Sequence, residues 1–216
     1  MAETKTKIHT VYKVADGTKA PSVTTVLGIL NKPALLDWAW RLGCEGVDYK
    51  AVRDNAADIG TLAHYLILCD LKKQKPDTSE YSPADVDKAE NCLIKYYGWL
   101  KEHPIEPVLV EEPLVSERFG FGGTIDCLAK LNGDLILIDH KTGKSIYDEM
   151  FYQLAAYKAL LNEHGHDIKS CRILRIGREN TGDFEERIIN DLDKQWQVFL
   201  ACLSIYKLKR SIKSQT

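Results

Sequence analysis

The residues best placed to do chemistry in this sequence are two aspartates and a lysine, Asp126, Asp139 and Lys141. An Asn132-Gly133 dipeptide lies between the two aspartates and predicts a type I′ hairpin, because both residues tolerate positive φ. With this pair as the loop, facing positions have numbers that add to 265, so Asp126 lies opposite Asp139. Facing carboxylates on one side of a sheet are unfavourable unless a group between them compensates, and a divalent cation is the natural candidate.

Strand alternation places a lysine side chain in this predicted site. Asp139 and Lys141 are two residues apart and share one side of the strand, whereas His140 points to the other side. The preceding run 135–138 is apolar on both faces, which is typical of a central strand covered on both sides. Charged groups at the end of such a strand are costly unless they are paired, hydrogen-bonded or bound to metal. This combination predicts an active site.

Composition sets broad limits on the class of protein. The chain has 216 residues, 44% of them hydrophobic and 28% charged, and a net charge of −2, as expected of an ordinary globular protein. No global basic field indicates nucleic acid, so any polyanion site must be a local patch. The apolar runs fall short of the roughly 20 residues that a membrane span needs. The N-terminus lacks the apolar segment of a signal peptide, so we expect a cytoplasmic protein without membrane contact.

The cysteines give no sign of a metal cluster. Six are spread along the chain without a CxxC or CxH pair, at positions 44, 69, 92, 127, 171 and 202. This spacing disfavours structural zinc and an iron–sulfur cluster, and it predicts reduced thiols.

The predicted elements form an α/β core that follows a helical N-terminal part. The sequence predicts a hairpin over 8–20, a short helix after the N-cap Ser22, and further helices over 33–41, 52–73 and 83–101. A strand over 107–115, the central hairpin, a helix over 147–162, a hairpin of 169–178 with 184–190 and a last helix capped by Asp191 or Asp193 follow. We divide the chain into 1–104 and 105–216, within one compact unit.

These motifs, taken together and in order, resemble a known family. The set Gly60-Thr61-x-x-His64, Glu111, Gly123-x-x-Asp126, Asp139-x-Lys141 and Gln153-x-x-x-Tyr157 resembles the PD-(D/E)XK nuclease superfamily, nearest to its RecB-type and phage-type exonucleases. The resemblance covers roughly residues 20–160, and one departure is Ile125 where the motif often has proline. It implies a restriction-endonuclease-like core, a central mixed β-sheet flanked by helices.

The resemblance also implies roles for individual residues. Asp126 and Asp139 would hold one or two Mg²⁺ or Mn²⁺ ions, helped by His64 and Glu111, and Lys141 would orient or deprotonate water or neutralise charge on phosphorus. The choice between Glu111 and Glu112 stays open, with Glu111 preferred because it precedes Pro113 by two residues. Gln153 and Tyr157 share a helix face and would orient Lys141 and contact phosphate. Independently of the resemblance, Thr142, Lys144 and Ser145 directly follow the strand and could contact the backbone of a nucleic acid.

Ordinary structural interpretations compete with these roles. His64 and Tyr157 are residue types that commonly pack in a core, and Asp139 with Lys141 could be a surface ion pair. Trp38 and Trp40 could stack on unpaired bases or pack in the core. The basic end of the last helix could contact DNA or simply face solvent.

The expected activity is therefore a metal-dependent DNA nuclease. The resemblance favours an exonuclease acting on DNA ends or single strands in bacterial or phage recombination, replication or repair. It leaves room for a recombination or single-strand-annealing protein as a partner and for a homo-oligomer. A structure-specific endonuclease for flaps or branches, or an inert nucleic-acid-binding module of the same fold, are the alternatives. The sequence contains no GxxxxGK[ST] pattern, so a helicase is not expected.

Overall fold

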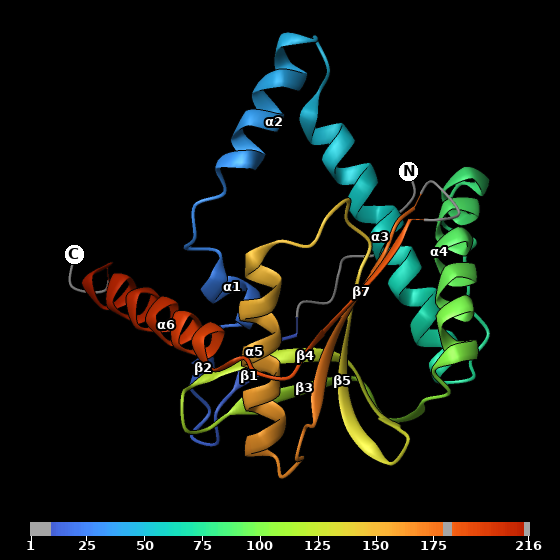
Figure 1. The fold of residues 1–216 in the computed structure, drawn as a ribbon. Coiled ribbons are helices and arrows are strands. Elements are labelled where there is room, and N and C mark those ends of the chain that lie inside the picture. The colour runs from blue at the N-terminus through green and yellow to red at the C-terminus, as the bar shows by residue number, and fades with distance from the viewer. Residues whose placement is uncertain (1–9, 179–182, 214–216) are drawn as a thin grey trace.

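A five-stranded mixed sheet with helices on both faces forms the centre of the computed structural model, which describes residues 10–178 and 183–213 (Figure 1). The strands lie in chain order: β3 (Glu106–Ser116), β4 (Phe121–Leu131), β5 (Asp134–Lys141), β6 (Ser170–Ile176) and β7 (Phe184–Ile189). Only β5 and β6 are parallel; the other neighbours in this sheet are antiparallel. The predicted α/β, restriction-endonuclease-like architecture is confirmed.

The turn between β4 and β5 has the predicted geometry. Asn132 and Gly133 have φ angles of 53° and 90°, as a type I′ turn requires. Leu131 pairs with Asp134 directly beside the turn. The ladder keeps this register as far as Cys127 and Ile138, so the predicted register is confirmed.

Helices cover the two faces of the sheet with separate apolar cores. On one face lie α1 (Val23–Leu27), α5 (Asp148–Glu163) and α6 (Asp193–Lys213), and on the other lie α3 (Tyr49–Leu71) and α4 (Pro83–Glu102). Helix α5 also provides the long connection that the parallel pair β5 and β6 needs. Because helices cover both faces, β5 is buried on both sides, as its apolar run predicted.

The helix starts follow local capping chemistry. Ser22 accepts a hydrogen bond from the backbone N–H of Thr25 at 3.0 Å, and Ser82 accepts one from Asp85 at 3.2 Å. Both serines therefore act as N-caps, as predicted. Helix α6 begins at Asp193, whose backbone N–H donates to the side chain of Asp191.

One helical pair stands away from the sheet. Helix α2 (Pro33–Cys44) and the first half of α3 extend outward beyond the segment that follows β5 (Figure 1). Helix α3 starts at Tyr49, three residues before the predicted start, because Asp48 caps it by accepting from the Lys50 N–H at 2.9 Å. The ring of Trp38 packs edge-on against Tyr49, whereas Trp40 is 72% exposed.

The remaining elements are small. Strands β1 (Tyr12–Lys13) and β2 (Lys19–Ala20) form a short antiparallel hairpin. The start of this hairpin at residues 8 and 9, and residues 180–182 of the turn between β6 and β7, lie outside the described residues. Among the helices of the described chain, none combines the length and apolarity needed to cross a membrane.

Candidate active site

Asp139 and Lys141 lie at the end of β5 on the side covered by α5. Asp139 is 1% exposed, and its Oδ2 lies 2.7 Å from Nζ of Lys141. The Lys141 ammonium donates a hydrogen bond to Oε1 of Gln153 at 3.0 Å, and Nε2 of Gln153 donates to the Tyr157 hydroxyl at 2.8 Å. Strand alternation, the i, i+4 spacing on α5 and the polar chain thus agree with the predicted grouping of these four residues.

The Asp139 carboxylate is incompletely satisfied. Its Oδ1 is buried and has no hydrogen-bond partner within the described chain. Burial raises the pKa of the Asp139 carboxyl to about 6, although the Lys141 ammonium favours its ionised form. Burial opposes the charge on Lys141 as well, but Asp139 and Asp126 outweigh it and raise the pKa of the lysine above its ordinary value. A buried oxygen with no donor is available to a cation.

Asp126 lies beside this pair but bonds to different partners. Its Oδ2 accepts a hydrogen bond from the backbone N–H of His140 at 2.7 Å. The Nδ1 atoms of His64 and His140 lie 3.8 and 3.7 Å from the same oxygen. Burial opposes ionisation of Asp126, yet the hydrogen bond from His140 and the charges of His64 and Lys141 hold the pKa of this carboxyl well below its ordinary value.

The expectation that the two carboxylates share one face needs correction. Ile125 and Cys127 are two residues apart and would point to the same side of a regular strand. Ile125 instead belongs to the core under α5 and Cys127 to the core under α3 and α4, so the alternation of side chains breaks at Asp126. Opposite it, Glu111 has a φ of 54° and drops out of the β3–β4 ladder. The distorted strand lets the Asp126 carboxylate reach His64 and the His140 backbone while Asp139 faces Lys141.

His64 lies on α3 and reaches the site from the opposite face of the sheet. Its ring packs edge-on against that of His140, with 6.1 Å between centroids. Burial lowers the pKa of His64, against the opposing effect of Asp126. Close approach of α3 depends on Gly60, since a Cβ there would lie 2.7 Å from Oγ1 of Thr142. Thr61 turns away and donates to the backbone carbonyl of Ala57.

A small cavity distinguishes Glu111 from Glu112. Glu111, His64, Asp126 and His140 line this cavity together with apolar residues of α3 and β3. Burial, followed by the charge of Asp126, raises the pKa of Glu111. Glu112 instead pairs with Ile125 in the β3–β4 ladder. The structure therefore brings Glu111 to the site.

Two further residues, Thr142 and Lys144, were predicted to contact nucleic acid. Thr142 lies close to the site and Lys144 lies farther out. Thr142 directly follows β5 and faces Gly60 of α3. Lys144 is exposed in the loop between β5 and α5. Their predicted roles in nucleic-acid binding stay predictions.

The predicted metal set does not form a coordination shell. Within residues 10–178 and 183–213, no three His, Cys, Asp or Glu side chains are grouped closely enough to hold a metal ion. Lys141 instead neutralises Asp139, and the His140 N–H satisfies Asp126. The donor chemistry nevertheless suits a hard cation, because two carboxylates with an unpartnered Asp139 oxygen lie beside an imidazole.

The hydrogen bond from the His140 backbone N–H to Asp126 was not predicted from the sequence. Alternation places the His140 ring on the far side of β5, where it packs edge-on against Tyr96 of α4 at 5.4 Å between centroids. Its backbone N–H, however, fixes the orientation of Asp126. No residue pattern reports that bond, because it depends on the local distortion of β4.

The mixed sheet and the charged group at the end of its central strand define a restriction-endonuclease-like α/β protein. A family model for the PD-(D/E)XK nuclease superfamily matches residues 45–203. The chain belongs to this superfamily. The match covers both the His64 segment on α3 and the Asp139–Lys141 pair.

Comparisons with individual proteins show only distant likeness. No curated protein matches the chain significantly. Among solved structures, SSO0001 shares 16% identity with a TM-score of 0.36, over 57% of this chain and 60% of its own. A protein from Eubacterium rectale named as a candidate exonuclease shares 13% identity with a TM-score of 0.49, over 70% of this chain and 65% of its own. LHK-Exo in complex with dAMP shares 18% identity with a TM-score of 0.36, over 71% of this chain and 85% of its own.

The chain therefore spans less than two thirds of the first two of these proteins. Membership of the superfamily rests on the family model alone.

Proposed function

We propose that this chain is a divalent-metal-dependent deoxyribonuclease that hydrolyses phosphodiester bonds, as an exonuclease acting on DNA ends or single strands. The observation that carries this proposal is the buried Asp139–Lys141 pair, with an unpartnered carboxylate oxygen, beside Asp126 and His64. Burying a carboxylate without full hydrogen bonding is costly, so its presence at the end of a central strand favours a functional role.

The metal ligands in this proposal are Asp126, Asp139 and His64, with Glu111 at the edge of the site. A bound Mg²⁺ or Mn²⁺ ion would lower the pKa of water and neutralise charge on the phosphate. Asp139 is protonated below a pH of about 6, so the free carboxylate that a cation needs is present at neutral pH. The proposal is for one or two Mg²⁺ or Mn²⁺ ions in the site.

Lys141 is the proposed group that contacts the reacting phosphate or the attacking water. Its raised pKa keeps the ammonium protonated at neutral pH, so it suits stabilisation of negative charge better than removal of a proton. Gln153 holds the ammonium from the side of α5, and Tyr157 fixes the amide of Gln153. Hydrolysis breaks the bond between phosphorus and the leaving oxygen and forms one to the oxygen of water.

The projecting helices support the proposed preference for DNA ends or single strands. Helix α2 and the first half of α3 extend beyond the β5 end of the sheet, and the exposed Trp40 offers a surface on which an unpaired base can stack (Figure 1). A role in bacterial or phage recombination, replication or repair, and cooperation with a single-strand-annealing protein, remain part of the proposal.

Cleavage of end-labelled single- and double-stranded DNA with and without Mg²⁺ tests the activity. Asp139→Asn and Lys141→Ala should each reduce cleavage by about 10²-fold or more. Asp134→Asn, at the exposed start of the same strand, and Lys130→Ala, exposed on β4, are matched controls that should keep wild-type rates. Undiminished cleavage by Asp139→Asn would refute the site, and cleavage of circular single-stranded DNA would favour an endonuclease.

A further inference from the structure

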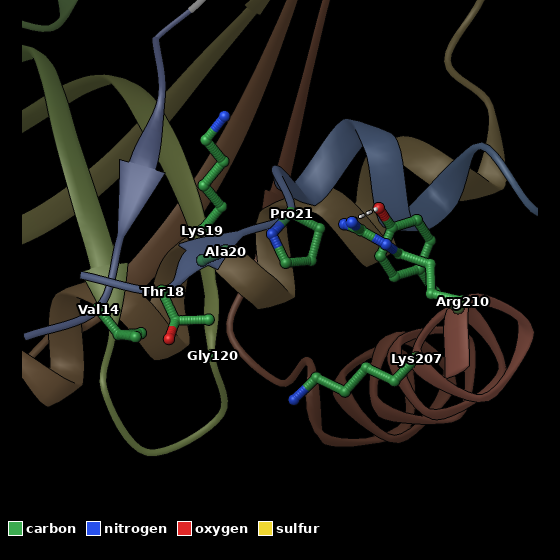
Figure 2. Close-up of a pocket in the computed structure, with 9 residues that line it drawn as sticks. Val14, Thr18, Lys19, Ala20, Pro21, Gly120, Lys207 and Arg210 are labelled. Carbon is green, nitrogen blue, oxygen red and sulfur yellow. Dashed lines mark hydrogen bonds between the residues drawn. The ribbon is translucent and has the colours of Figure 1, made fainter. Parts of the chain in front are cut away.

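A basic cavity lies between α6, the β1–β2 hairpin and the β3–β4 turn. It measures about 240 Å³ and is lined by Val14, Thr18, Lys19, Ala20, Pro21, Gly120, Tyr206, Lys207 and Arg210. Figure 2 shows Lys207 and Arg210 projecting from α6 toward the turn at Gly120 and toward Pro21. Three of the lining side chains are cationic and none is acidic.

The cations of α6 are held in place without being neutralised. Lys207 donates to the backbone carbonyl of Phe119 at 2.7 Å, and Arg210 donates to the hydroxyl of Tyr206 at 3.4 Å. Neither residue forms an ion pair within the described chain. The carboxylate of Glu117 on the adjacent turn is bonded to the backbone N–H of Ala15. The positive charges of the cavity are therefore available to an anion.

The cavity and the candidate active site lie near the two ends of one stretch of chain, from Gly120 to Asp126. Gly120 precedes β4, and Asp126 lies six residues further on, which corresponds to roughly 20 Å at the rise of a β-strand. The chain after Pro21 follows the same path, since Gly122 donates its N–H to Pro21 at 2.9 Å and Val23 packs against Gly123. A strand stacked as in duplex DNA, with a rise of about 3.4 Å per nucleotide, covers that distance in about six nucleotides.

We propose that the cavity lined by Lys19, Lys207 and Arg210 binds a backbone phosphate of the nucleic-acid strand about six nucleotides from the bond that is cleaved. This inference rests on the proposed function and adds a second anchoring point for the substrate. Lysine and arginine side chains contact phosphate without reading sequence, so the site increases affinity for longer strands whatever their sequence. Thr18 adds a hydroxyl to the cavity lining.

The test compares a 20-nucleotide with a 4-nucleotide single strand, both fluorescently labelled, by anisotropy in EDTA. The variant Lys207→Ala/Arg210→Ala is paired with Lys194→Ala/Lys209→Ala, which removes the same charge from exposed positions of α6 outside the cavity. We expect the first variant to reduce the ratio of 20-mer to 4-mer affinity about tenfold. We also expect its plot of log affinity against log salt to become shallower by about 1.4. Thermal unfolding confirms that both variants fold.

Several outcomes would overturn the inference. An equal loss of DNA affinity in both double variants would show that only the net charge of α6 matters. An equal loss of affinity for the 20-mer and the 4-mer would show that Lys207 and Arg210 bind the end of the strand. Calorimetry with inorganic phosphate and with dAMP separates free ligands from a strand: binding of either that is lost in Lys207→Ala/Arg210→Ala, with DNA affinity unchanged, would assign the cavity to a free phosphate.

The same samples assayed with Mg²⁺ keep the two proposals apart. If the wild type cleaves DNA and Lys207→Ala/Arg210→Ala binds the 20-mer as tightly as the wild type, the proposed phosphate site is wrong and the proposed nuclease activity stands. If the wild type does not cleave DNA but Lys207→Ala/Arg210→Ala loses more affinity for the 20-mer than for the 4-mer, the proposed nuclease activity is wrong and the cavity still binds a phosphate of the strand.

Discussion

Gln153 on α5 accepts a hydrogen bond from Lys141 on β5, with 3.0 Å between Oε1 and Nζ. Tyr157 accepts from the amide of the same glutamine at 2.8 Å, so the glutamine cannot rotate its amide without losing both bonds. Through these contacts a helix packed on one face of the sheet sets the direction of a charged group at the end of the central strand. Gln153 is thus a positioning residue for Lys141.

Substituting Gln153 should slow the reaction more than it weakens binding. We expect Gln153→Ala to lower kcat about 10- to 100-fold with a smaller change in KM, because a misplaced ammonium no longer meets the developing charge. Gln153→Glu keeps an acceptor for Lys141 and should recover part of the rate, and Tyr157→Phe should cost less than Gln153→Ala. Steady-state kinetics on a labelled oligonucleotide measures both parameters. A rise in KM alone would indicate that Gln153 contacts only the substrate.

Removing the lysine should destabilise the metal-free protein in a pH-dependent way. Lys141→Met leaves the Asp139 carboxylate buried without its cation, which costs about 3–5 kcal/mol of unfolding free energy when the carboxylate is charged. Loss of the lysine raises the pKa of Asp139 further above its value of about 6, so the penalty is present at pH 8 and shrinks at pH 5. Urea unfolding at the two pH values measures this difference.

Lys130→Met is the control for that experiment, since Lys130 is exposed on β4 and its loss should change the unfolding free energy by less than about 0.5 kcal/mol. A penalty for Lys141→Met that stays constant between pH 5 and pH 8 would show that the ion pair with Asp139 is not its cause.

Metal affinity should fall in acid. Burial raises the pKa of Asp139 to about 6, so protons compete with a cation for this carboxylate below that pH and not above it. We expect the dissociation constant for Mn²⁺ to rise about tenfold per pH unit below 6 and to level off above 7. Calorimetry in EDTA-treated protein measures it. Asp126, whose pKa is lowered, stays ionised over this range, and a pH-independent affinity would exclude Asp139 as a ligand.

Gly60 and Thr142 should show a coupled effect on stability. A methyl group at position 60 would lie 2.7 Å from Oγ1 of Thr142, so Gly60→Ala requires either the threonine side chain or α3 to move. We expect the double variant Gly60→Ala/Thr142→Ala to be about 1–2 kcal/mol more stable than the sum of the single changes predicts. Denaturant unfolding of the four proteins measures this coupling. Simple additivity would mean that the threonine rotates aside at no cost.

Local rules predicted the parts of the fold that depend on neighbouring residues. The Asn132-Gly133 turn, the register from Cys127 to Ile138 and the N-caps at Ser22 and Ser82 follow from turn and capping chemistry, and all were predicted correctly. Family motifs identified the superfamily, which the match over residues 45–203 confirms.

The geometry at Asp126 was beyond such rules. Pairing arithmetic assumes regular alternation, but β4 changes faces between Ile125 and Cys127, and Glu111 opposite adopts a positive φ. At this irregular position the Asp126 carboxylate accepts its hydrogen bond from the backbone N–H of His140. Sequence reasoning therefore named most of the residues that the structure brings together in the candidate site, but it placed the two carboxylates on one face of the sheet.

Lengthening the turn tests whether register alone assembles the site. One glycine inserted between Asn132 and Gly133 keeps every site residue but shifts β5 by one position against β4, which moves Asp139 and Lys141 to the face of α3 or forces a bulge. We expect cleavage to fall below detection while the far-ultraviolet circular dichroism keeps its helical signal. A two-glycine insertion leaves room for the original pairing with a longer loop and should recover activity. Equal loss from both insertions would attribute the effect to general destabilisation of the hairpin.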